Sequence, residues 1–166
     1  MAGETAKTGA VEDSPIRAIA DARAFHALRE RAYRLLARRE YSCFELRRKL
    51  TPHDGHGQLD LLLDSLVSED SLSDRRFADQ LGRSRYRAGK GPRLLEQELR
   101  RHRLEEDIVQ EVMSQYRESW RDLAAEVRQK RFGTAPPEDY RAWAKQARFL
   151  QQRGFTADEI GSYDEA

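Results

Sequence analysis

The stretch Arg83–Pro92 reads RSRYRAGKGP. It can be interpreted either as a turn between two helices or as a phosphate-binding loop, and this choice decides the fold class. Its four cationic side chains, one aromatic ring and two glycines suggest a nucleotide site at first. A Walker loop requires a glycine, four further residues, and then Gly-Lys followed by Ser or Thr, whose hydroxyl reaches magnesium. Here Ser84 stands five residues before Gly89, and Gly91 follows Lys90, so the pattern fails at both ends.

Turn chemistry explains the same stretch better. Gly89 stands where a helix often ends on a left-handed residue, a conformation that glycine adopts without steric cost. Pro92 suits the first turn of the next helix, where its missing N–H leaves no hydrogen bond unmade. The stretch therefore predicts a tight turn between two helices, although the turn does not account for its arginines.

Helical periodicity extends over almost the whole chain. Leu59, Leu62, Leu63 and Leu66 follow the i, i+3, i+4, i+7 spacing of one helix face, and no segment alternates convincingly with a period of two. Both observations favour an all-α fold.

Capping signals and periodicity divide the chain into short helices that form sets of three. Ser42 with Glu45 and Thr156 with Glu159 match the capping box, in which each side chain satisfies the other residue's backbone N–H. The predicted helices form three sets of about 45 residues, a period typical of repeat arrays. The predicted ranges are 24–40, 42–50 and 58–67; 73–88, 92–102 and 105–118; and 120–131, 137–153 and 156–163.

The middle helices of the three sets are similar to one another. Each places a leucine directly ahead of a basic or amide pair, with another apolar residue four or five positions after that leucine. Leu46, Leu99 and Leu150 are therefore expected at equivalent core positions. The three segments are FELRRKL (44–50), EQELRRHRL (96–104) and ARFLQQRGF (147–155).

These patterns predict tandem three-helix repeats in an elongated array. The expected units are residues 21–72, residues 73–119, which are basic, and residues 120–166. Residues 1–20 are expected to form a disordered or weakly ordered tail, because the first 13 are poor in large apolar groups. Ser14 before Pro15 places a helix N-cap within this tail.

Charge is distributed unevenly along the chain despite a net charge of only +1. Residues 18–49 hold nine Lys or Arg and four Asp or Glu, residues 50–73 hold none and five, and residues 74–103 hold ten and four. From residue 104 onward the counts are nine and thirteen. Different faces or units are therefore expected to meet different partners.

The cellular setting also follows from composition. No run of 18 apolar residues occurs, and the N-terminus lacks the basic-then-apolar pattern of a secretion signal, so we expect a soluble, cytoplasmic protein without a membrane partner. The single cysteine, Cys43, cannot form an internal disulfide, which agrees with a reducing compartment. It falls in the apolar series with Leu46 and Leu50 and is expected in the core.

Several segments, taken in order, resemble the RecX family of regulatory proteins. The resemblance runs from about Arg31 to Ile160. The matching segments are LLARREYSCFELRRKL (35–50), SLSDRRFADQLGRSR (71–85), GKGPRLLEQELRRHRL (89–104), KRFG (130–133) and RFLQQRGF (148–155).

The resemblance implies a protein that binds the RecA recombinase and restrains it. Members of the family are similar in having tandem three-helix repeats, arranged as a curved body that lies in the groove of the RecA–DNA filament. There they are understood to hinder filament growth, ATP hydrolysis, strand exchange and co-protease activity in the SOS response. The resemblance thus implies a role in DNA repair and recombination, with a monomer bound to RecA or its DNA filament and DNA itself as a further possible partner.

Basic clusters are the candidate binding residues. One cluster surrounds the turn at residues 89–91, where cations could neutralise phosphates and an aromatic ring could stack, or where they could meet an acidic protein surface. A second cluster ends the helix at residues 42–50, where cations also stabilise the helix dipole. An ordinary solvated face is the alternative for both. The candidates are Arg47, Arg48, Lys49, Arg83, Arg85, Tyr86, Arg87, Lys90, Arg93, Arg100, Arg101 and Arg103.

Catalysis and metal binding have little support. No Ser/His/Asp or Cys/His arrangement has a recognisable spacing, so no enzyme activity and no cofactor are expected. His53, Asp54 and His56 lie in a glycine-rich loop, a poor framework for a metal site. The rival hypothesis is a helix-turn-helix DNA-binding regulator with residues 92–103 as recognition helix, which would bind duplex DNA without RecA.

Overall fold

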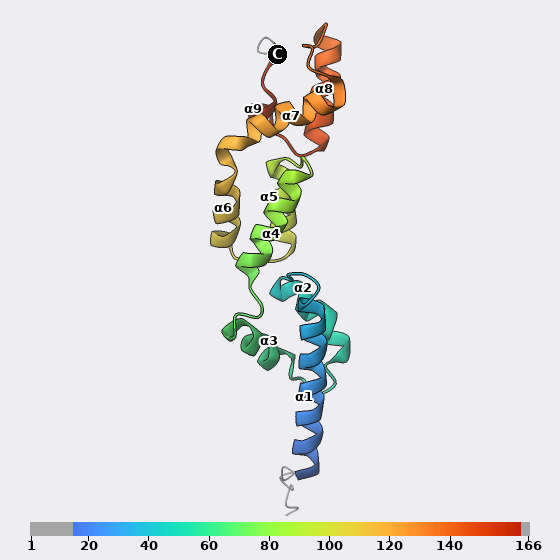
Figure 1. The fold of residues 1–166 in the computed structure, drawn as a ribbon, viewed down its shortest axis with the longest axis vertical. Coiled ribbons are helices and arrows are strands. Elements are labelled where there is room, and N and C mark those ends of the chain that lie inside the picture. The colour runs from blue at the N-terminus through green and yellow to red at the C-terminus, as the bar shows by residue number, and fades with distance from the viewer. Residues whose placement is uncertain (1–14, 164–166) are drawn as a thin grey trace, which may run out of the picture.

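The computed structural model describes residues 15–163, and this part of the chain is all-α, as predicted. Its helices follow one another in groups of three along an elongated body (Figure 1). None of the helices between residues 15 and 163 is long and apolar enough to span a membrane. The predicted cap at Ser14 and most of the predicted tail lie outside the described residues.

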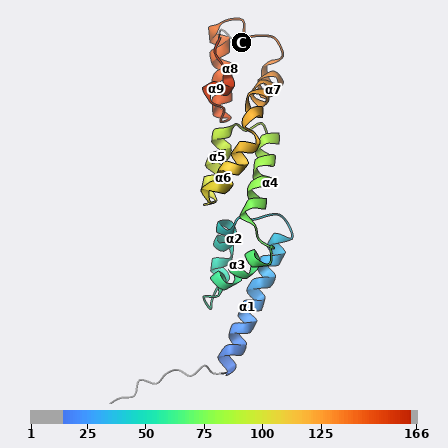
Figure 2. The same ribbon diagram turned by 90° about the vertical axis from the view of Figure 1, so that its left-hand side faces the viewer.

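The helices form three successive groups. Figure 2 shows the first helix of each group on one side of the body and the second helices stacked one above another on the other side. The first group is α1 (Pro15–Leu36), α2 (Cys43–Leu50) and α3 (Leu59–Ser68), with a 3-10 turn at Thr51–His53. The second is α4 (Asp74–Arg87), α5 (Pro92–Arg101) and α6 (Glu106–Gln115), and the third, after a 3-10 turn at Arg117–Ser119, is α7 (Trp120–Phe132), α8 (Tyr140–Gln152) and α9 (Ala157–Ile160).

Some helix ends differ from prediction. Helix α1 begins at Pro15 and not at residue 24, so residues 15–20 belong to a helix and not to a tail. The alanines of this segment are the strongest helix formers, which explains the extension. Helix α9 stops at Ile160, because Gly161 leaves the helix with a φ of 76°. The predicted unit boundaries after residues 72 and 119 stay predictions.

Capping chemistry sets most of the remaining ends. The Ser42 hydroxyl accepts a hydrogen bond from the Glu45 N–H at 3.1 Å, but the Glu45 carboxylate turns away to Arg39 and only half of the predicted box forms. The box at Thr156 and Glu159 is complete. Gly89 has a φ of 66° and Pro92 opens α5, so the predicted turn is confirmed.

Two separate hydrophobic cores lie along the body. The first packs the helices α1 to α3 around Leu46, Leu50 and Leu62, which are fully buried. The second is shared by the helices α4 to α9, and it contains both Leu99 and Leu150. The predicted core positions of Leu46, Leu99 and Leu150 are therefore confirmed, and the second and third groups share one interior.

A contact between two turns joins the second and third groups. The Gly91 N–H donates to the Arg153 carbonyl at 2.7 Å, and the Arg93 N–H donates to the Gly154 carbonyl at 3.0 Å. The backbones approach so closely that a Cβ on Gly91 would lie 2.4 Å from atoms of Gly154 and Phe155. Glycine at position 91 is thus a requirement of this contact.

The junction between the first and second groups is polar instead. The Cys43 N–H donates to the Asp74 carboxylate at 2.7 Å, and the Ser42 hydroxyl lies 3.2 Å from His102 Nδ1. Arg76 of α4 pairs with Glu40 at 3.0 Å. Burial, reinforced by the Asp74 charge, raises the pKa of the Cys43 thiol to about 11, while burial lowers the pKa of His102. Both groups are therefore neutral at physiological pH.

We expect Gly91→Ala to lower the free energy of unfolding by about 1–3 kcal/mol, the usual cost of overpacking. The φ of Gly91 is −77°, so alanine fits the backbone and only the contact with Gly154 and Phe155 is disturbed. Urea denaturation followed by circular dichroism measures the change. Gly55→Ala is the matched control, because nothing lies within 4 Å of its added Cβ. Equal stabilities of the two variants would contradict the role of the turn contact.

Candidate binding surface

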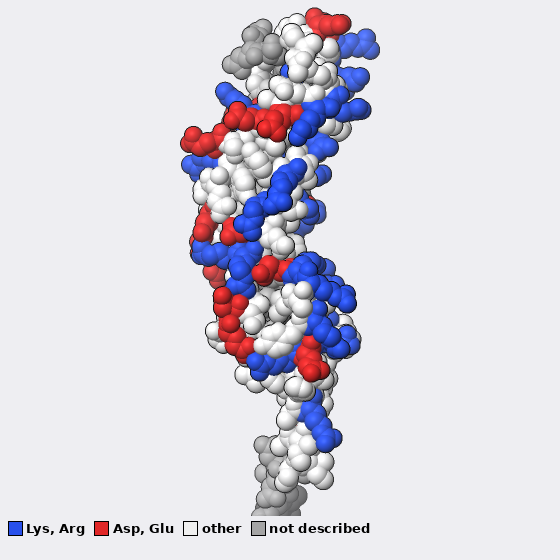
Figure 3. Space-filling view, in the orientation of Figure 1, with Lys and Arg blue, Asp and Glu red and all other residues white. Residues whose placement is uncertain are grey.

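The second helix of each group carries three exposed cations, and further exposed cations lie on the first helices. Because α2, α5 and α8 bury their apolar side chains in the cores, their charged side chains face solvent. In Figure 3, Lys and Arg are frequent along the right-hand edge of the body, whereas the left-hand edge, where Figure 1 places α3 and α6, carries both Asp or Glu and Lys or Arg. The right-hand edge is therefore the more basic side of this view.

In α2 the burial of Leu46 and Leu50 leaves all three predicted cations exposed. Arg47 forms an ion pair with Asp60 of α3. Arg48 and Lys49 have no anionic partner within the described part of the chain. These two charges are therefore available to a ligand.

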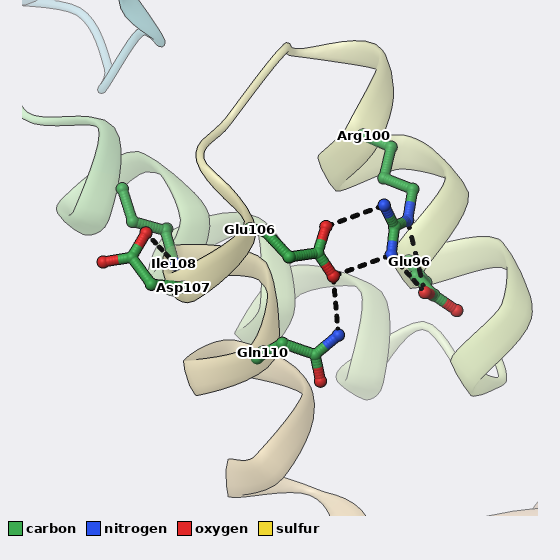
Figure 4. Close-up of polar contacts among 6 residues, drawn as sticks. All are labelled: Glu96, Arg100, Glu106, Asp107, Ile108 and Gln110. Carbon is green, nitrogen blue, oxygen red and sulfur yellow. Dashed lines mark hydrogen bonds and ion pairs between the residues drawn. The ribbon is translucent and has the colours of Figure 1, made fainter.

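In α5 the predicted cations divide in the same way. Arg100 bridges two carboxylates, donating to Glu96 at 3.0 Å and to Glu106 at 2.7 Å (Figure 4). Glu106 also accepts a hydrogen bond from Gln110, so its pKa is lowered, first by this amide and then by the Arg100 guanidinium. Arg100 thus clamps the end of α5 to the start of α6.

Three other predicted residues make contacts between helices of the protein itself. Arg85 of α4 pairs with Glu98 of α5. The Arg103 guanidinium lies 4.5 Å from the centre of the Phe44 ring and so links the first and second groups. The Tyr86 ring stacks on Tyr116 at 4.9 Å and packs against Trp120 as well. Tyr86 is thus a packing residue, which explains it without a base-stacking role.

The remaining predicted cations lie on α4, on α5 and in the turn between them. Arg93 and Arg101 are exposed on α5 and form no ion pair between residues 15 and 163. Arg83 and Arg87 lie near Tyr116, at the end of α6, where their charges oppose the rise in its pKa that burial causes. Lys90 is half-buried in the turn. The predicted cluster is therefore distributed over α4, the turn and α5.

Helix α8 adds three cations that the sequence reasoning missed. Arg141, Lys145 and Arg148 are exposed, and none has an anionic partner in the described residues. Their i, i+4, i+7 spacing places them on one helix face, opposite the buried Leu150, and that spacing was the available signal. We call the unpaired cations of the three second helices the unpaired cation row. Its members are Arg48, Lys49, Arg93, Arg101, Arg141, Lys145 and Arg148.

The unpaired cation row can bind anions but carries no reactive chemistry. Lys and Arg donate hydrogen bonds and supply charge to phosphates or carboxylates, and Arg does so bidentately. In the glycine-rich loop with His53 and His56, the Asp54 carboxylate accepts hydrogen bonds from the N–H groups of Gln58 and Leu59. Asp54 thus stabilises the start of α3. Residues 15–163 hold no group of three His, Cys, Asp or Glu suited to a metal ion.

Comparison with sequence families identifies two segments. The family model described as RecX, second three-helix domain, matches residues 73–113. The model described as RecX, third three-helix domain, matches residues 121–163. These segments correspond to the second and third helix groups.

Individual relatives extend the similarity over most of the chain. Regulatory protein RecX of Halorhodospira halophila is 42% identical over 139 residues, which cover 82% of this chain and 86% of that protein. Regulatory protein RecX of Acidithiobacillus ferrooxidans is 42% identical over 130 residues, covering 78% and 83%.

Solved structures share the fold. The crystal structure of RecX from Lactobacillus salivarius superimposes with a TM-score of 0.74 at 18% identity, covering 87% of this chain and 96% of the other. A second crystal structure of regulatory protein RecX gives a TM-score of 0.77 at 21% identity, covering 97% and 83%.

The Arg100 clamp predicts a pH-dependent loss of stability. Arg100→Ala should lower the midpoint of thermal unfolding at neutral pH. Arg101→Ala should not, because this adjacent exposed cation forms no ion pair in the part of the chain that the structure describes. A carboxylate with a lowered pKa, such as Glu106, stabilises the fold above its unfolded pKa of about 4.3 and loses this effect as the pH falls through its folded value. The difference between the two variants should therefore shrink below about pH 4. A constant difference down to pH 2 would exclude the ion pair as its cause.

Proposed function

This chain belongs to the RecX family of regulatory proteins, and from that premise we propose that it binds RecA filaments on DNA and limits their activity. The activities concerned are recombination, ATP hydrolysis and co-protease action. Binding alone accounts for such a function, and no chemical step by this protein is needed.

The unpaired cation row is the observation that carries the proposal. It supplies exposed, uncompensated charge on all three helix groups, along the length of the body shown in Figure 2. A ligand that repeats along an axis, such as a filament of protein and DNA, could contact every group at once. Modest contacts then combine, because each later contact forms at high effective concentration.

The proposed surface keeps part of the residue set expected from the sequence. Arg48, Lys49, Arg93 and Arg101 stay in it, and the three cations of α8 are added. Arg47, Arg85 and Arg100 are left out because their charges are already paired within the protein. Arg83 and Arg87 are also exposed, and no ion pair involves them within residues 15–163, but they lie on α4 and not on a second helix. The proposed site therefore consists of the uncompensated charges of α2, α5 and α8.

The helix-turn-helix alternative is disfavoured by the position of α5. A recognition helix inserts its N-terminal residues into the major groove. Here the start of α5 is covered by the third group, since Gly91 and Pro92 are buried and the Arg93 N–H is bonded to Gly154. A groove-reading role for α5 would require this contact to open.

RecA ATP hydrolysis on single-stranded DNA, measured as the protein is titrated in, tests the proposed function. A DNA-only binding assay at the same salt concentration is the control, because phosphate contacts are salt-dependent. We expect inhibition well below the concentration that saturates the free DNA. Inhibition that appears only when the free DNA is saturated would indicate competition for DNA and contradict direct action on the filament.

Charge reversal tests the surface itself. The triple variant Arg48→Glu, Arg101→Glu, Arg148→Glu should raise the midpoint of inhibition by about tenfold, since three weak ion pairs are lost and replaced by repulsion. The matched control is Arg31→Glu, Arg83→Glu, Arg117→Glu, which removes three exposed cations outside the row that form no ion pair within residues 15–163. Equal effects of the two triple variants would remove the row from the proposal.

A further inference from the structure

A groove separate from the unpaired cation row lies where the end of α4 meets α7 and α8. It has a volume of about 530 Å³. Its floor is apolar and is formed by Leu123 and Val127 of α7 together with Phe149 of α8. Figure 2 shows α7 directly above the end of α4, so the groove follows the junction of the second and third groups. No part of the proposed filament contact uses it.

Cations surround this apolar floor. Four cations and a single acid, Glu126, line the groove, so its lining carries a net charge of +3. Glu126 lies 3.7 Å from Lys130 and compensates at most that one charge. The four are Arg87, Lys130, Arg131 and Arg153.

One of the four cations is held in a fixed position. The Arg153 guanidinium donates to the carbonyls of Ala88 at 3.0 Å and Gly89 at 3.3 Å, where it caps the end of α4. Arg87 and Arg131 are exposed and have no carboxylate partner within residues 15–163. The rim therefore offers one pre-positioned and two free guanidinium groups to an anionic ligand.

The aromatic rings of the groove are already engaged within the protein. The Phe149 ring meets Phe132 edge-on at 5.3 Å, and Arg153 lies 5.3 Å from its centre. The Tyr86 ring is stacked on Tyr116. A nucleobase that binds by stacking needs a free aromatic face. An aliphatic side chain needs only apolar surface, which the half-buried Phe149 provides together with the exposed edges of Leu123 and Val127.

We propose that this groove binds an acidic peptide segment of a partner protein, in which a leucine-like side chain stands between carboxylates. The carboxylates meet Arg87, Arg131 and Arg153, and the aliphatic side chain covers Leu123 and Val127. Charge complementarity selects the acidic character, because a neutral or basic peptide leaves the net positive rim uncompensated. The engaged aromatic rings favour a peptide over a nucleic acid.

Fluorescence anisotropy of the full chain with a fluorescein-labelled peptide of sequence EDLEDLE tests this proposal. Saturable binding is expected, and the double variant Arg87→Glu, Arg131→Glu should weaken it by about tenfold. The matched control is Arg23→Glu, Arg31→Glu, two exposed cations of α1 that have no carboxylate partner among the described residues. It should leave the affinity within about twofold. Equal losses in both double variants would overturn the groove as the site.

Two measurements on the unaltered protein complete the test. The peptide EDSEDSE keeps the charge but lacks the leucines, and it should bind at least several-fold more weakly because the apolar floor stays uncovered. Equal binding of the two peptides would contradict the role of Leu123 and Val127. An oligothymidylate of the same charge should not displace EDLEDLE. Displacement by that oligonucleotide would show that the groove takes nucleic acid and would overturn the proposal.

Discussion

The contact between the turn at residues 89–91 and the turn at residues 153–155 is the constraint on which the upper two thirds of the body depend. Two backbone hydrogen bonds join these turns, from Gly91 to Arg153 and from Arg93 to Gly154. The Arg153 side chain adds bonds to the last carbonyls of α4. Because a backbone contact this close admits no Cβ at position 91, it fixes the distance between the two helix groups, and their apolar side chains then complete one core.

The two junctions along the body therefore differ in kind. The second and third groups share a hydrophobic interior, which resists separation because apolar surface would be exposed to water. The first group has its own core and meets the second through hydrogen bonds and ion pairs, among them Arg76 with Glu40. Polar junctions exchange readily with water, so the angle at this junction is the easier one to change.

Neighbouring arginines of the same helix have different roles. Arg100 is neutralised by Glu96 and Glu106, while its neighbour Arg101 carries an uncompensated charge. Arg47 and Arg48 divide in the same way in α2. Pairing holds the helices of each group together, whereas the uncompensated charges form the unpaired cation row and the rim of the groove. Although the net charge of the chain is only +1, parts of its surface therefore carry local positive charge that attracts anions.

Local chemistry was sufficient to determine much of this protein from its sequence. Helical periodicity, the left-handed Gly89 and the opening Pro92 act within a few residues, so the all-α fold, the turn and the buried Leu46, Leu99 and Leu150 could be predicted. Which cations are free could not, because pairing joins residues distant in the chain. Arg103 lies over Phe44, and Tyr86 stacks on Tyr116, only after the helices have packed. The sequence determined where the charges are, and the tertiary structure alone decided which of them a ligand can use.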